Sequence, residues 1–136
     1  MGARLVCRGS LRPSPVTGLY AVRIEYTVSE PPLVVVESPS LIGRHDQADI
    51  PHMYPAGDRW PAHPCLYYPN DGDWTADRPL ATTIVPWLLE WLLHYEVWLT
   101  TGEWRGGGVD HGTGSSSTLD AAVPNAAAPL ETVRAL

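Results

Sequence analysis

The segment at residues 82–101 is the strongest constraint on how this chain can fold. Wound as a helix, it places Trp and Leu side chains on almost every side. A helix of this kind is stable only when other elements cover most of its surface. Thr82 or Thr83 can cap its N-terminus, Pro86 fits its first turn, and Gly102 is typical of the residue that ends a helix. We therefore predict one long helix in the core.

Three earlier segments have the pattern of β-strands. Residues 20–28 alternate apolar and polar side chains with a period of two, which predicts a half-buried strand. Residues 33–37 are rich in β-branched side chains, and residues 4–8 form a shorter candidate in which Cys7 is expected to face the core. Residues 52–54 could add a fourth, short strand. Short connections predict an α+β fold, in which an antiparallel β-meander of about four strands packs on one long helix.

The length and net charge of the chain limit the classes of protein to which it can belong. The 136 residues suggest one domain at residues 1–111, followed by a flexible tail at 112–136 that is rich in Ser, Ala, Thr and Pro. The net charge of −6 and the lack of a basic run argue against nucleic-acid binding. No apolar run reaches the roughly 18 residues of a membrane span, and the start lacks the apolar core of a secretory signal. We expect a cytoplasmic location, where a Cys7–Cys65 disulfide is not expected.

The residues best suited to chemistry lie together at 51–69, PHMYPAGDRWPAHPCLYYP. Four prolines and a glycine precede Cys65, so we predict an irregular, pre-organised loop. This loop delivers Cys65 to the start of a short extended piece at 65–68, and it also holds His52 and His63. A thiolate is a strong nucleophile, and a loop position near histidines suits that role.

The sequence leaves other roles open for these residues. A free cysteine is most often a small buried apolar residue. His52, His63, Cys65 and His111 include zinc-type ligands, but they lack the spacing of a zinc motif, so neither a metal nor a cofactor is expected. A Cys–His hydrolase would draw its partners from distant parts of the chain. His94, inside the apolar helix, is expected to be a packed core histidine.

Several short words of the sequence resemble one family when taken as a set: PHMY, CLYYP, NDGDW and IVPWLLEWLLHYEVWLTTGEWRGGG. Together they resemble the bacterial ubiquitin-conjugating-like proteins of type II CBASS antiviral operons, including short systems without a fused activating domain. The resemblance covers about residues 11–108. It implies a trimmed ubiquitin-conjugating fold and a cysteine that carries an acyl thioester. The implied donor is the C-terminus of a ubiquitin-like protein or of a cGAS-like nucleotidyltransferase, and the acceptor is an amine. The resemblance leaves open whether an activating enzyme takes part.

The resemblance also assigns roles to residues of the loop. Cys65 takes the position of the thioester cysteine, and His52 that of the histidine in the family's His-Pro-Asn loop. Tyr54 follows two residues later, so the asparagine that helps to stabilise the oxyanion has no direct counterpart. His52 is then structural, or itself donates to the oxyanion. Asp71 and Asp73 could orient or deprotonate an incoming amine, or could simply form a turn.

His63 has no assigned role at this point. A non-catalytic binding module of the same fold, which holds a partner protein, is the alternative function. The chain contains no lysine, since all nine basic residues are arginine. Codon bias in a GC-rich genome explains such a composition. A carrier of activated acyl groups would also gain from it, because it would have no side-chain amine of its own to modify.

Overall fold

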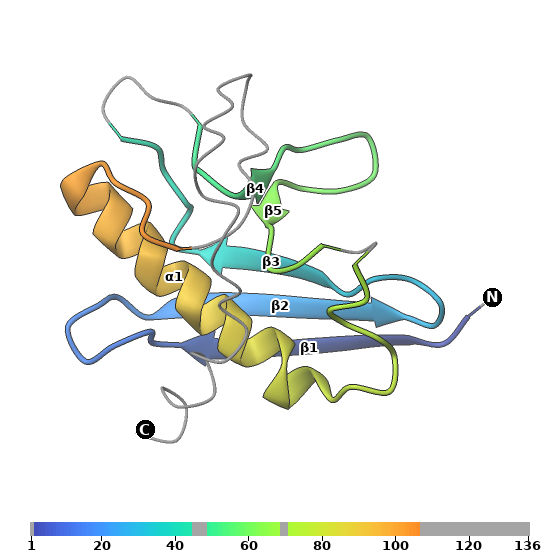
Figure 1. Ribbon diagram of the computed structural model, residues 1–136. Coiled ribbons are helices and arrows are strands. Elements are labelled where there is room, and N and C mark those ends of the chain that lie inside the picture. The colour runs from blue at the N-terminus through green and yellow to red at the C-terminus, as the bar shows by residue number, and fades with distance from the viewer. Residues whose placement is uncertain (1, 45–48, 69–70, 107–136) are drawn as a thin grey trace.

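A three-stranded antiparallel sheet, ordered β1-β2-β3, forms the base of the fold in the computed structural model. The structure describes residues 2–44, 49–68 and 71–106, and the tail predicted at 112–136 lies outside these ranges. The helix α1 crosses one face of the sheet (Figure 1). The fold is therefore α+β, as predicted. The elements that build this layer pair are β1 Arg4–Leu11, β2 Tyr20–Thr27, β3 Leu33–Ser38 and α1 Ile84–Thr101.

The central strand β2 supplies the face on which the helix packs. Its alternating residues Tyr20, Val22 and Ile24 are buried, as the period-two pattern predicts. Val34 of β3 lies opposite Ile24 and joins the same cluster. The helix contributes the other half of the core, and its contacting residues are Ile84, Leu88, Trp91, Leu92, Tyr95 and Trp98.

The expectation that Cys7 lies in the core is wrong, because its side chain is exposed. Cys7 pairs with Ile24, so both side chains point to the face of the sheet that carries the helix. However, the buried residues of the core come from β2, β3 and α1, and of the edge strand β1 only Leu11 packs against them. Leu5, on the same face of β1, is 49% exposed for the same reason. The alternation of side chains along a strand predicts which residues share a face of the sheet. Whether those residues are buried depends on where the helix packs.

Both ends of α1 agree with the sequence-based bounds. Thr83 occupies the N-cap position, although its hydroxyl makes no capping hydrogen bond to the helix. Gly102 ends the helix in the left-handed region with a φ of 81°, and its N–H donates to the carbonyl of Trp98 at 2.8 Å. Arg44 satisfies another terminal carbonyl, since its Nε donates to Leu99 at 3.0 Å. In the part of the chain that the structure describes, neither α1 nor any other helix has the length and apolarity to cross a membrane.

The predicted fourth strand exists, but it does not extend the meander. Strand β4, Met53–Tyr54, pairs antiparallel with β5, His63–Pro64, in a separate two-stranded ladder. Figure 1 shows this small hairpin beside β3, at the far edge of the sheet from β1. Prolines cannot donate to a ladder, which keeps both strands short. The extended piece expected at residues 65–68 is not a strand in the structure, because β5 ends at Pro64 and Cys65 follows directly after it.

A short 3₁₀ turn, η1 Leu80–Thr82, leads from the loop after Cys65 into the helix. The chain thus runs from the sheet through the β4–β5 hairpin to Cys65, and then through a loop and η1 into α1. In chain order, the cysteine lies between the hairpin and the helix.

Candidate functional site

The backbone of Cys65 is fixed to both the hairpin and the helix. Its N–H donates to the carbonyl of His52 at 2.8 Å. The same carbonyl accepts a second hydrogen bond, at 2.9 Å, from the indole Nε1 of Trp91 on α1. A carbonyl oxygen has two lone pairs, so one acceptor serves both donors. The cysteine is held at a defined place although it lies outside any regular strand.

His52 supplies this carbonyl from an unusual backbone conformation. Its φ is +53°, in the left-handed region that residues other than glycine seldom adopt. The side chain is 8% exposed, and its ring centroid lies 5.1 Å from that of Trp104. Such a conformation persists only where the surroundings support it, and here the two hydrogen bonds to the carbonyl do so. The structure places the backbone of His52 against Cys65 and its ring against Trp104.

Tyr54 is the side chain that reaches the thiol. Its hydroxyl and the Cys65 thiol are joined by a side-chain hydrogen bond. Strand pairing positions the tyrosine, because Tyr54 lies opposite His63 in the β4–β5 ladder and the two rings are 5.1 Å apart. The sequence analysis gave Tyr54 no role. The sequence held one indication of such a role, because Tyr54 lies two residues after His52, at the position where the family has its asparagine.

Burial dominates the electrostatics of the thiol. Removal from water raises the pKa of Cys65, because the charged thiolate loses more hydration than the neutral thiol. The hydrogen bond from Tyr54 and the contact with the Tyr67 backbone, 3.8 Å from Sγ to the carbonyl oxygen, act in the opposite direction without cancelling the effect. Burial is also the largest cause of the raised pKa of Tyr54, and the interaction with Cys65 raises that pKa further. At neutral pH both groups are therefore protonated.

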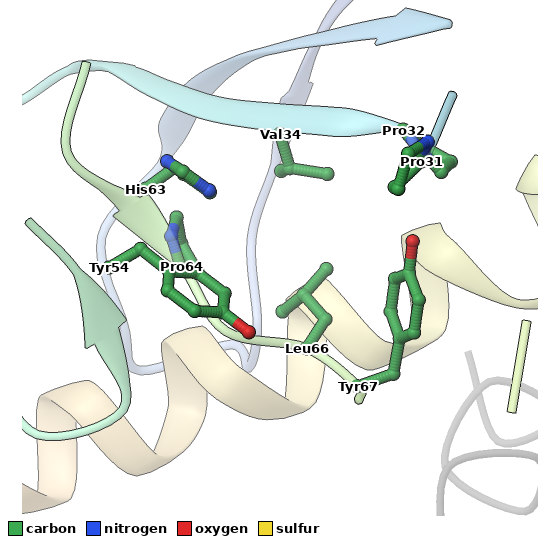
Figure 2. A pocket seen from close by; sticks show the side chains of 8 residues that line it. All are labelled: Pro31, Pro32, Val34, Tyr54, His63, Pro64, Leu66 and Tyr67. Atoms are coloured by element: carbon green, nitrogen blue, oxygen red, sulfur yellow. The ribbon is translucent and has the colours of Figure 1, made fainter. Parts of the chain in front are cut away.

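A small recess lies on the side of the hairpin that faces β3 (Figure 2). Its volume is about 70 Å³, roughly half that of a ~150 Å³ cavity that holds benzene. Figure 2 shows Tyr54 on one wall with its hydroxyl directed toward Leu66, while the hydroxyl of Tyr67 is directed toward Pro31 and Pro32 at the other end. The recess therefore suits a small aliphatic group. Its lining residues are Pro31, Pro32, Val34, Tyr54, His63, Pro64, Leu66 and Tyr67.

His63, which had no predicted role, is one of these lining residues. Its Nδ1 lies 2.8 Å from the carbonyl oxygen of Pro61, and its ring packs on Tyr54. Its contacts therefore connect it to Cys65 through Tyr54.

Asp71 and Asp73 belong to an exposed turn that follows the site. The N–H of Asp71 donates to the carbonyl of Tyr68 at 3.2 Å, and Arg78 donates to the backbone carbonyl of Asp73 at 2.6 Å. These contacts are those of a turn, the second of the two roles that the sequence left open.

A metal site finds no geometric support in the described ranges. Among residues 2–44, 49–68 and 71–106, no three His, Cys, Asp or Glu side chains gather as they would around an ion. His111, one of the zinc-type residues of the sequence, lies outside these ranges. His94 packs within the helix region, with Nε2 3.6 Å from the Glu90 carboxylate and its ring 5.9 Å from Trp104.

A hairpin-borne cysteine between a meander and a helix is the arrangement expected of a trimmed conjugating fold. The family model of the type II CBASS E2 proteins matches residues 1–112, and the chain therefore belongs to this family. Membership gives it an E2-like role in CBASS, alongside other CBASS proteins. A search of curated proteins returned no match.

Proposed function

We propose that Cys65 carries an acyl group as a thioester and passes it to an amine in antiphage defence. The observation that supports this most is the placement of Cys65. Its N–H donates a hydrogen bond to the carbonyl of His52, and its thiol interacts with the Tyr54 hydroxyl. A small recess lies beside the hairpin that precedes it. Membership of the type II CBASS E2 family supports a role in antiphage defence. The donor is the C-terminus of a cGAS-like nucleotidyltransferase or of a ubiquitin-like protein, delivered by an activating enzyme.

The chemistry needs positioning more than strong base catalysis. A thioester is higher in energy than an amide, so aminolysis runs downhill once the amine is placed and the oxyanion is stabilised. In this scheme His52 is a positioning residue that acts through its carbonyl on the backbone of Cys65. His63 supports Tyr54 from the opposite strand. Asp71 and Asp73 shape the exposed turn near which an amine approaches.

The composition fits a carrier of this kind. A chain without lysine offers an activated acyl group no side-chain amine of its own. Transfer to a partner then meets little internal competition.

Co-expression with a cGAS-like nucleotidyltransferase from a type II CBASS system tests the proposal. We expect a covalent adduct that a reducing thiol removes, seen on a non-reducing gel and by intact mass. Cys65→Ala abolishes it, and Cys65→Ser converts it into an ester that resists reduction. Cys7→Ala is the matched control, because Cys7 is exposed on the edge strand away from the core. An adduct that persists in Cys65→Ala contradicts the proposal.

One observation favours the alternative of a non-catalytic binding module. Burial raises the pKa of the Cys65 thiol, which lowers the thiolate fraction that a nucleophile needs at neutral pH. A binding module would keep antiphage protection in Cys65→Ala, whereas a carrier would lose it. Protection against phage in cells that carry either form separates the two functions.

A further inference from the structure

Tyr54 pairs with His63 in the β4–β5 ladder, and Cys65 lies two residues after His63, so Tyr54 and Cys65 belong to the same face of the hairpin. The Tyr54 hydroxyl hydrogen-bonds to the Cys65 thiol from the neighbouring strand of the hairpin. In a thioester on Cys65, the acyl oxygen lies only two bonds from Sγ. A donor that already reaches Sγ therefore reaches that oxygen after a small rotation about its own side-chain bonds.

Other groups near Cys65 make contacts of their own. The N–H of Cys65, a common oxyanion donor for a nucleophile, is bonded to the carbonyl of His52 at 2.8 Å. The ring of His52 packs on Trp104, and Nδ1 of His63 faces the carbonyl of Pro61. The hydroxyl of Tyr67 points to the far end of the recess (Figure 2).

We propose that the Tyr54 hydroxyl is a catalytic residue, the hydrogen-bond donor to the acyl oxygen while it carries negative charge during transfer at Cys65. The proposal rests on the proposed function of Cys65 and names the group that stabilises its oxyanion. A neutral phenol in a partly desolvated site is an established kind of oxyanion donor. Because burial raises the pKa of Tyr54, the hydroxyl keeps its proton throughout the neutral range.

The two steps balance without an added oxidant or reductant. In loading, the Cys65 sulfur bonds the acyl carbon, the bond to the donor's leaving group breaks, and that group departs with the thiol proton. In transfer, the amine nitrogen bonds the same carbon, the carbon–sulfur bond breaks, and a proton from the amine returns to Cys65. In both steps Tyr54 keeps its own proton and donates only a hydrogen bond.

A small synthetic donor tests this role without the biological partner. The purified full chain is mixed with the N-acetylglycine thioester of mercaptoethanesulfonate, and acylation of Cys65 is followed by intact mass in a Cys7→Ala background. Ethanolamine is then added, and loss of the acyl group is timed. We expect Tyr54→Phe to slow both steps by roughly 10²- to 10³-fold, the usual cost of one oxyanion donor. Tyr26→Phe is the matched control, because Tyr26 lies on β2 and does not line the recess, and it should stay close to wild type.

Alkylation of Cys65 by iodoacetamide separates catalysis from packing. That reaction displaces iodide and forms no oxyanion, so Tyr54→Phe should affect it far less than acyl transfer. Tyr54→His, which keeps a ring and an N–H donor, should recover part of the lost rate if Tyr54→Phe proves unstable. Equal slowing of alkylation and acyl transfer, or unchanged acyl transfer in Tyr54→Phe, overturns the role of Tyr54 alone. Failure of wild-type Cys65 to load at all overturns the proposed function instead.

Discussion

The carbonyl of His52 accepts hydrogen bonds from both the N–H of Cys65, at 2.8 Å, and the indole of Trp91, at 2.9 Å. One backbone oxygen thus ties the cysteine to the core helix. Trp91 is 4% exposed, so its indole is a structural link to the site from inside the core. The position of the thiol depends on a residue 26 positions further along the chain.

Trp91→Phe should therefore weaken both the fold and the site. It removes the indole donor and leaves a small cavity, which should cost about 1–3 kcal/mol in the free energy of unfolding. Trp98→Phe is the control, because Trp98 is similarly buried on the same helix, whereas the indole that donates to His52 belongs to Trp91. Urea denaturation measures stability, and the acylation rate of Cys65 measures the site. Comparable acylation rates in the two folded variants would contradict the link through His52.

The pH profile of Cys65 alkylation should lie above that of an ordinary thiol. Thiolate is the reactive form, and burial raises the pKa of Cys65, so the rate should reach its midpoint at higher pH than in an unstructured cysteine peptide. Since the Tyr54 hydrogen bond lowers this pKa, Tyr54→Phe should move the midpoint higher still. Iodoacetamide kinetics across pH in the Cys7→Ala background provide the measurement. An alkylation midpoint at lower pH than that of the peptide would mean that the pKa of Cys65 is lowered, and it would contradict this prediction.

Tyr20→Phe should destabilise the fold without disturbing the site. The Tyr20 hydroxyl donates to Glu96 of α1, and the same carboxylate lies 3.4 Å from the N–H of Gly18. Loss of a partly buried hydrogen bond to a carboxylate should cost about 1.5–3 kcal/mol. Urea midpoints report the loss, and Tyr26→Phe, on the less buried end of β2, is the control. A Cys65 acylation rate that falls in folded Tyr20→Phe would show unexpected coupling.

Gly102→Ala should shorten or loosen the end of α1. The glycine has a φ of 81°, and a Cβ there would clash with the Arg44 guanidinium. The left-handed conformation alone should cost about 1–2 kcal/mol for alanine. Gly9→Ala is the control, because a Cβ at Gly9 meets nothing within 4 Å. Thermal unfolding should show a lower midpoint for Gly102→Ala and little change for Gly9→Ala.

Asp71→Asn combined with Asp73→Asn should leave both acyl loading and transfer within about twofold of wild type, as expected for exposed turn residues. The ethanolamine assay checks this. A selective fall in transfer, with loading intact, would instead indicate that the carboxylates act on the incoming amine.

The sheet and the helix were predictable because their patterns are local. The alternation along β2 and the apolar helix that ends at Gly102 both follow from short-range periodicity. The exposure of Cys7 was not predictable, since it depends on which strands the helix covers. Tyr54 was missed as a site residue because its contact with Cys65 requires a ladder of only two residues per strand, inside a proline-rich segment that favours a loop.

The raised pKa of Cys65 also bears on oxidative damage. Peroxide attacks the thiolate, and susceptibility to sulfenic acid formation follows thiolate character and access to solvent. A thiol that is half-buried and protonated at rest is therefore a slow target for peroxide. If Cys65 has the proposed role, the same burial that limits its reactivity at rest would protect it from oxidation between rounds of transfer.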